Sequence, residues 1–167
     1  MPESRQYSTF TVSGLFFGIE VLKVQEVLRS LEMTQVPLAP DVEGLINLRG
    51  QIVTAIDKRR RLGLPDRATD QNPMLMVVRS DGDAVSLLVD EIGDVLEVTE
   101  DRSEAAPANM PKEQRDVIEG VYKLDGRLLL VLDVDRALEM NTWNRLDRTK
   151  LPRRKSDYER RRSDSDV

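Results

Sequence analysis

The sequence predicts an all-β protein made of two similar small barrels, and three observations support this fold class. Short segments alternate apolar and polar residues, glycine-containing turns separate them, and one stretch of the chain occurs twice. Hydrophobic residues make up 40% of the 167 residues but aromatic residues only 4%, so the core must be aliphatic. This length suits one or two small domains.

The strands follow from hydrophobic period and turn signals. Apolar residues alternate with period two from Leu15 to Val21 and from Val85 to Val89, which indicates half-buried strands. Segments 74–78 and 128–132 are apolar on both faces and are therefore expected to be central strands. Glycine turn signals flank these segments at Ser13-Gly14, Asp81-Gly82 and Asp125-Gly126.

Helices are expected to be few and short. Segment 24–31 has helical spacing of apolar residues, but it is β-branched and fits a turn followed by a strand equally well. Segment 40–45 is expected to form one helical turn opened by a proline. Segment 133–140 predicts a true helix with Asp133 as its N-cap, and with Val134, Ala137 and Leu138 facing inward.

An internal repeat connects two of these regions. The segment GQIVTAID at 50–57 matches GRLLLVLD at 126–133, and in both copies a Leu follows the final Asp by five residues. The repeated unit would be a turn, a strand, an N-cap and a short helix that packs back. Chance similarity between two buried strands is the alternative. A repeat favours two similar barrels, in which closure removes the exposed strand edges.

Charge separates the end of the chain from the rest. The formal net charge is -5, yet residues 145–167 hold nine Lys and Arg against five Asp and Glu, so the remainder carries -9. This end also lacks apolar periodicity. We therefore expect a folded domain over residues 5–140, divided into two barrels, and a charged, disordered tail over 141–167.

The composition excludes several kinds of site. The chain contains no His and no Cys, so zinc fingers, Ser-His-Asp triads, Cys nucleophiles and disulfides are absent. No glycine-rich phosphate loop occurs. Asp57 and Asp133 are explained as helix caps, and Asp90-Glu91 as an exposed turn. We expect no enzymatic activity, no catalytic residue, no metal and no cofactor.

Location follows from what the chain lacks. The N-terminus has neither a basic region nor an apolar stretch typical of a secretory signal. The longest aliphatic run, 128–132, is far shorter than the roughly 20 residues of a membrane helix. A cytoplasmic protein is the expectation.

Two basic runs raise nucleic-acid binding as a function. Lys58–Arg61 and Arg160–Arg162 are the runs, but the rest of the chain is acidic and no aromatic residues interleave with the arginines to stack on bases. A solvated helix face is the favoured interpretation of the first run. A small-barrel protein that binds nucleic acid through its arginines stays as the alternative function.

Arg49 has an unusual position between Leu48 and Gly50, directly before a buried strand. A guanidinium at a partly dry site is expected to pair with a carboxylate, and Glu26 is a candidate. An exposed loop arginine is the plain alternative.

At these residues the sequence resembles the CheW family of chemotaxis coupling proteins. The resemblance rests on FGIEVLKVQEV at 17–27, VP at 36–37, GLINLRGQIV at 44–53 and ID at 56–57, and it extends from about Tyr7 to Met140. It implies two SH3-like five-stranded β-barrels with a few short helices, in agreement with the repeat.

The resemblance also implies a function. CheW-like proteins are non-catalytic adaptors that couple chemoreceptors to the histidine kinase CheA, with the receptor's cytoplasmic hairpin tip in a groove between the barrels. Carried over, Val24, Glu26 and Arg49 occupy receptor-binding positions, with Glu26 and Arg49 as a salt bridge. The kinase's regulatory domain would meet the barrel ends at residues that stay unassigned, and the membrane would be reached only through receptors. Thr54 and Lys58 depart from the family's usual proline and leucine.

Overall fold

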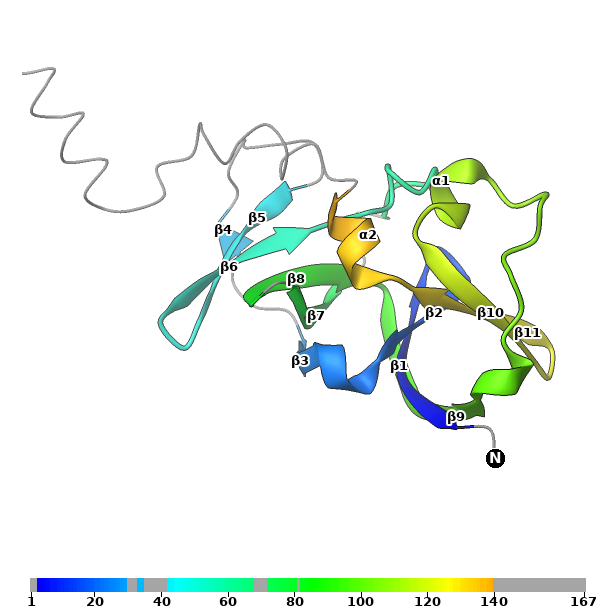
Figure 1. Cartoon of the computed structure of the whole chain (residues 1–167). Coiled ribbons are helices and arrows are strands. Elements are labelled where there is room, and N and C mark those ends of the chain that lie inside the picture. Colours follow the sequence, from blue (N-terminus) through cyan, green and yellow to red (C-terminus); the bar gives the residue numbers. More distant parts are fainter. Residues whose placement is uncertain (1–2, 30–32, 35–41, 68–71, 81, 140–167) are drawn as a thin grey trace, which may run out of the picture.

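Two curled sheets make up the molecule in the computed structural model, which describes residues 3–29, 33–34, 42–67, 72–80 and 82–139 (Figure 1). Barrel A, as we call the first, has the strand order β3-β7-β8-β6-β5-β4. Its strands are β3 (Val24–Leu28), β4 (Met33–Thr34), β5 (Val42–Leu48), β6 (Gln51–Ile56), β7 (Met74–Ser80) and β8 (Asp83–Val89).

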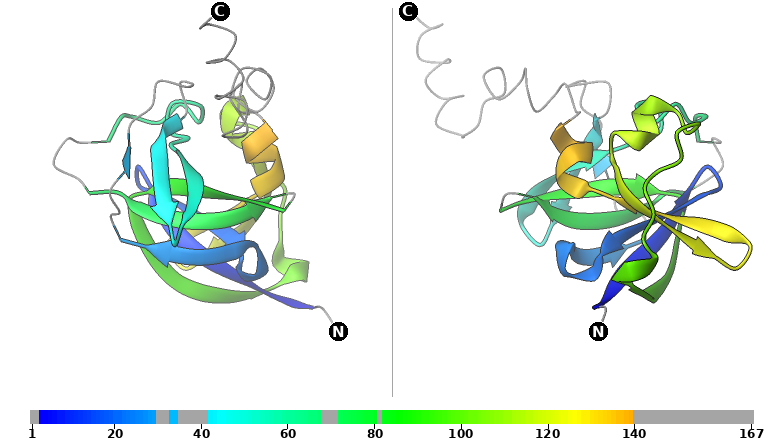
Figure 2. Two further views of the ribbon diagram at one scale, coloured as in Figure 1. Left: turned by 90° about the vertical axis from the view of Figure 1, so that its left-hand side faces the viewer. Right: turned by 45° about the vertical axis from the view of Figure 1, so that its right-hand side comes forward.

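Barrel B has the order β10-β11-β2-β1-β9 and combines the two ends of the described chain. Its strands are β1 (Ser4–Val12), β2 (Leu15–Glu20), β9 (Glu91–Thr99), β10 (Ile118–Leu124) and β11 (Arg127–Leu132). The two barrels lie side by side, with the helix at the end of the described chain between them (Figure 2).

The fold class is therefore confirmed. Barrel B has the five strands expected of each barrel, whereas barrel A gains the two-residue strand β4 at its edge. The segments predicted to be central, 74–78 and 128–132, fall in β7 and β11, and each of these strands has a neighbour on both sides. Ser13 and Gly14 join β1 to β2 with φ of 52° and 81°, as a tight hairpin turn requires.

The described helices are few and short, as expected: η1 (Val21–Lys23), η2 (Glu100–Arg102), α1 (Lys112–Arg115) and α2 (Val134–Glu139). The Asp133 carboxylate caps α2 by accepting the backbone N–H of Arg136 at 3.1 Å, and Val134, Ala137 and Leu138 are buried as predicted. Within the described ranges, no helix combines the length and hydropathy needed to span a bilayer.

Two local predictions are settled by strand pairing. Residues 24–28 form β3, so the turn-and-strand alternative is correct. The helical turn predicted for 40–45 is wrong where it can be checked, because β5 begins at Val42 and pairs with β6, with Gly44 opposite Ala55. Tertiary pairing overrides the local helix signal here. Leu31, Pro40, Asp41, Asp81 and residues 140–167, which include the predicted tail, lie outside the described residues.

The internal repeat extends to the strand pairing of both barrels. The repeated strands β6 and β11 each pair antiparallel with the preceding strand, and parallel with the second strand of a hairpin, β7–β8 or β1–β2. The edge strands β3 and β9 pair with the first strand of those hairpins, and both pairings contain a bulge. The helix predicted after each copy is present only as α2, because turns follow Asp57.

The largest hydrophobic cluster lies between the barrels. It joins Phe10 and Phe17 of barrel B, whose rings stack 5.6 Å apart, with Met76 and Leu87 of barrel A and with residues of α2. Each barrel adds a smaller cluster of its own. The one in barrel A includes Ile46, Val53 and Val77, and the one in barrel B consists of Tyr7, Phe16, Tyr122, Leu129 and Val131. The barrels therefore share one continuous core.

Candidate functional site

Glu26 and Arg49 form the ion pair that the sequence predicted. The guanidinium Nη1 and Nη2 of Arg49 donate to the two carboxylate oxygens of Glu26, both at 2.8 Å. This fork-to-fork geometry fixes direction as well as distance. The Arg49 side chain is 74% exposed and that of Glu26 only 17%, so the pair presents its cationic half to solvent.

Local sequence explains why Arg49 reaches Glu26. Arg49 and Gly50 form the β5–β6 turn with φ of 52° and 84°, and Gly50 supplies the positive φ at no steric cost. The Asn47 side-chain oxygen accepts the Gly50 N–H at 2.9 Å and holds the turn. Glu26 lies on edge strand β3, with β7 and β8 between it and the hairpin. The ion pair therefore joins the hairpin tip to the far edge of the same curled sheet.

Val24 starts the same strand but has a different environment. It pairs with Val78, whereas Glu26 pairs with Val77, so a bulge separates the two residues. Val24 is half-buried and packs against the core between the barrels. The structure thus brings Glu26 and Arg49 together, with Val24 close along the strand and fixed by the core.

Exposed apolar side chains stand next to the ion pair in sequence. Val27 follows Glu26 and is 38% exposed, and Ile52 lies two residues after the β5–β6 turn and is 64% exposed. Because Glu26 and Arg49 are in contact, these residues lie on strands that the ion pair links. Exposed apolar side chains on strands that an oriented ion pair connects are a feature of protein-binding surfaces.

A second group of charges, the inter-barrel cluster, was not predicted from the sequence. It consists of Asp57, Arg59, Arg67 and Asp90. Arg59 is only 4% exposed, and its guanidinium donates to the Asp90 carboxylate and to the Pro65 carbonyl at 3.1 Å. Arg67 lies 3.3 Å from the Asp57 carboxylate and 3.7 Å from that of Asp90. Burial, with the nearby charge of Arg67, lowers the pKa of Arg59.

This cluster corrects three sequence-based interpretations. The run Lys58–Arg61 is not a solvated helix face, because the chain forms turns there and Arg59 is buried. Asp57 caps no helix but accepts the Arg59 backbone N–H at 3.0 Å. Asp90 is not an exposed turn residue, since its side chain is 17% exposed. One feature of the sequence pointed to this cluster: the run of cations after Asp57 stands where a helix dipole would disfavour positive charge.

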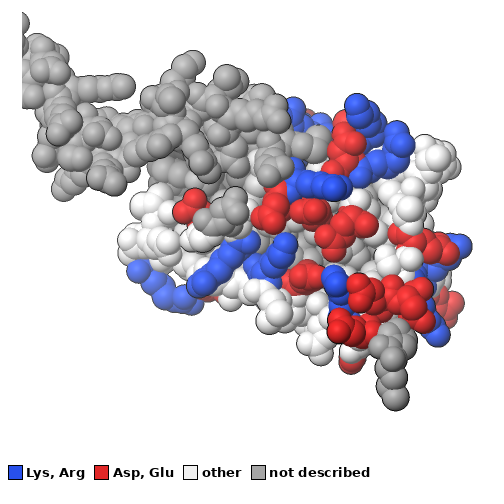
Figure 3. All heavy atoms as spheres, viewed as in Figure 1, with Lys and Arg blue, Asp and Glu red and all other residues white. Residues whose placement is uncertain are grey.

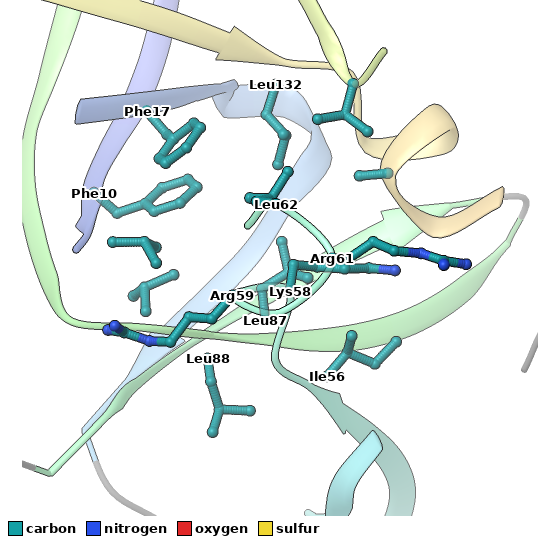
Figure 4. A pocket seen from close by; sticks show the side chains of 14 residues that line it. Phe10, Phe17, Ile56, Lys58, Arg59, Arg61, Leu62, Leu87, Leu88 and Leu132 are labelled. Atoms are coloured by element: carbon teal, nitrogen blue, oxygen red, sulfur yellow. The ribbon is translucent and has the colours of Figure 1, made fainter. Parts of the chain in front are cut away.

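Lys58, which departs from the family's usual leucine, borders the core between the barrels. It lines an apolar cavity of ≈ 30 Å³ together with Phe10, Phe17 and Leu62 (Figure 4). An amphipathic lysine stem can cover apolar surface of this kind. The Nζ atom of Lys58 is itself buried, so this lysine lies at the edge of the core with its charged end covered.

Basic and acidic residues are distributed unequally between the two barrels. Residues 21–89 hold nine basic and nine acidic residues, whereas residues 1–20 and 90–139 together hold seven basic and sixteen acidic ones. Figure 3 shows carboxylates gathered on the side of the molecule where barrel B lies. An acidic barrel beside a neutral one is a poor surface for nucleic acid. Among the described residues, no group of three or more acidic side chains has the geometry of a metal site.

Comparison with known proteins gives consistent matches. The CheW-like domain family matches residues 6–141. "Chemotaxis protein CheW" of Bacillus subtilis is 35% identical over 132 residues, covering 78% of this chain and 84% of the relative. The protein of the same name from Klebsiella aerogenes is 30% identical over 135 residues, covering 80% and 81%.

A solved structure agrees with these sequence matches. The scaffolding protein TtCheW from Thermoanaerobacter tengcongensis superposes with a TM-score of 0.73 and 26% identity, over 84% of this chain and 92% of that one. Family, relatives and fold lead to the same conclusion: the chain belongs to the CheW family of chemotaxis proteins.

Proposed function

We propose that this protein couples chemoreceptors to a CheA-type histidine kinase, with the receptor's cytoplasmic hairpin tip docking at Val24, Glu26 and Arg49. The observation that carries the proposal is the bidentate Glu26–Arg49 pair, which is oriented before any partner arrives and keeps Arg49 74% exposed. A preformed pair lowers the ordering cost of binding.

The surroundings of the pair support a helical partner. Val27 and Ile52 expose apolar side chains on the strands that the pair links. A helix laid in a groove needs such apolar contacts, and charged groups beside them fix its direction. Val24 would contribute its solvent-facing part from a position fixed by the core.

As a member of the CheW family the chain is a non-catalytic scaffold, so its activity is to hold proteins together. The kinase's regulatory domain is the second partner, and no residue of the described chain is assigned to it. The protein would act in the cytoplasm and join membrane-associated receptor arrays through the receptors alone.

Arg49→Glu tests the receptor site. The change replaces the ion pair with two like charges, so affinity for a receptor hairpin fragment should fall by about tenfold or more, while kinase-fragment affinity stays within about twofold. Isothermal titration against both fragments, with thermal melts as a folding check, measures this. Arg60→Glu is the matched control, because Arg60 is 73% exposed and pairs with Asp66 at 3.3 Å.

Unchanged receptor affinity in the folded Arg49→Glu protein would refute the site assignment. Salt-steep binding to generic DNA or RNA without affinity for either fragment would instead favour the nucleic-acid alternative.

A further inference from the structure

Asp90 connects the two barrels through its two carboxylate oxygens. It lies between β8 of barrel A and β9 of barrel B. Its Oδ2 accepts the Ser13 backbone N–H of barrel B at 2.8 Å, and its Oδ1 accepts from Arg59 of barrel A. Its own N–H donates to the Thr11 carbonyl at 2.9 Å. One carboxylate, only 17% exposed, therefore binds both barrels at the point where the chain passes between them.

The loop that carries Arg59 is held from several directions. In Figure 4 the Arg59 side chain extends away from those of Lys58 and Arg61, which point to the other side of the loop. Leu62 fills the core between the barrels, and the buried Gln114 side chain of α1 donates to the Leu62 carbonyl at 3.1 Å. The loop that follows β6 of barrel A therefore contacts barrel B. Arg59 provides the buried charged contact of this loop.

A charged group this deeply buried is costly unless it is paired, so its geometry is tightly specified. The contact between Lys23 and Asp135 also joins the two halves, but at 3.7 Å and with both side chains more than a third exposed. Such an exposed pair can adjust its geometry at little cost. Arg59 and Asp90 are more constrained, because their side chains are only 4% and 17% exposed and Asp90 also binds the Ser13 backbone.

We propose that Arg59 and Asp90 are positioning residues: they fix the orientation of barrel A relative to barrel B, and thereby the shape of the groove between the barrels. The consequence for the groove rests on the proposed receptor-binding function, whereas the orientation itself does not. Val24 supports the link, since it packs on the same inter-barrel core and lies two residues from Glu26.

The test uses the double variant Arg59→Met with Asp90→Asn. Both charges are removed together, which leaves Arg67 paired with Asp57 and no buried charge without an opposite. The native chain contains no cysteine, so spin labels can be placed at two introduced cysteines alone. Exposed Asp83 of barrel A and exposed Glu113 of α1, which contacts β10 of barrel B, are suitable positions.

The inter-label distance distribution should be narrow in the parent protein and broader or displaced in the double variant. A label pair within barrel A, at Glu43 and Asp83, should be unchanged, so a general loss of structure is distinguished from a change in orientation. Arg60→Met with Asp66→Asn is the matched control, because it makes a similar change in an exposed pair. Parent-like distances between the barrels in the folded double variant would overturn the proposal.

The affinity for the receptor fragment is the second measurement on these variants. Affinity for the hairpin fragment should fall about tenfold in the Arg59 and Asp90 variant and stay constant in the Arg60 and Asp66 control. A changed orientation without weaker binding overturns the groove part of the proposal. Failure of the proposed function itself appears separately, as unchanged receptor affinity in Arg49→Glu.

Hydrogen exchange in the parent protein tests the contact without any substitution. Ser13 and Arg49 occupy the same position in two turns of one type, each with φ of 52°. Because Asp90 accepts the Ser13 N–H, that amide should exchange roughly 100-fold more slowly than that of Arg49. Equal exchange would show that the contact does not hold the turn, and would overturn the proposal even if the double variant fails to fold.

Discussion

Two arginine–carboxylate pairs, each with its arginine on the barrel A side, differ in almost everything but chemistry. Arg49 and Glu26 meet at the surface, where the arginine side chain is 74% exposed. Arg59 and Asp90 meet between the barrels, where the arginine side chain is 4% exposed. The exposed pair can be substituted without loss of the fold and is therefore suited to binding. The Arg59–Asp90 pair is part of the packing between the barrels, so its substitution should affect the fold.

The largest effect on stability is expected when one partner of the Arg59–Asp90 pair is removed. Asp90→Ala leaves the buried Arg59 without the carboxylate that its guanidinium contacts, so the free energy of unfolding should fall by about 3–5 kcal/mol. Urea denaturation measures the loss. Glu26→Ala is the comparison, with an expected loss of about 0–1 kcal/mol because Arg49 can turn to solvent. Equal losses would remove the distinction between the two pairs.

An effect of intermediate size concerns how much the interaction between Glu26 and Arg49 contributes to stability. A double-mutant cycle of Glu26→Ala and Arg49→Ala should give a coupling free energy of about 0–1 kcal/mol, which decreases as salt is added. A coupling near that of a buried pair would mean that the Glu26–Arg49 pair stabilises barrel A, and that its role is not chiefly geometric.

The smallest effect concerns the acidic barrel B. Desolvation by its neighbours, followed by the charges of Asp133 and Glu20, raises the pKa of the exposed Glu119 above its ordinary value of 4.5. The protonated carboxyl is favoured in the folded state, so its stabilisation is complete below about pH 4.5 and is lost as pH rises through the raised pKa.

Denaturation midpoints measured across that window should fall less in Glu119→Gln than in the parent protein. Glu113→Gln, which changes another exposed glutamate, on α1, provides the control. Parallel pH profiles for the parent and Glu119→Gln would contradict the assignment.

The repeat teaches a second difference between the barrels. Both keep the same order of five strands and the same bulged edge pairing, yet the position of Arg49 in the repeat is occupied by Asp125 in barrel B. Barrel B therefore cannot form the equivalent of the Glu26–Arg49 pair. Apolar period and turns account for the shared backbone pattern, whereas the surface residue at this position differs between the two copies.

Local patterns in the sequence account for most of the fold. Period-two alternation identified β2 and β8, Gly126 marked a hairpin, and Asp133 marked the start of α2. These features depend on neighbouring residues only. Strand β5 was mistaken for a helical turn because its pairing with β6, which decides its conformation, is not a local property.

The two ion pairs also differ in how far the sequence could predict them. Arg49 was paired with Glu26 because a turn arginine before a buried strand needs a carboxylate, and the family resemblance supplied the same partner. Arg59 was not recognised because four consecutive cations indicate a solvated face, and its partner Asp90 lies 31 residues away. Only the packing of one barrel against the other brings these two side chains together.

A bridging assay tests directly whether this molecule holds a receptor and a kinase at the same time, as we propose. Receptor hairpin fragments are immobilised, and retention of the kinase's regulatory domain is measured with and without the protein. The parent protein should retain the kinase fragment, and Arg49→Glu should lose that retention while still binding the kinase in solution. Displacement of one partner by the other, or equal retention by Arg49→Glu, would contradict the account.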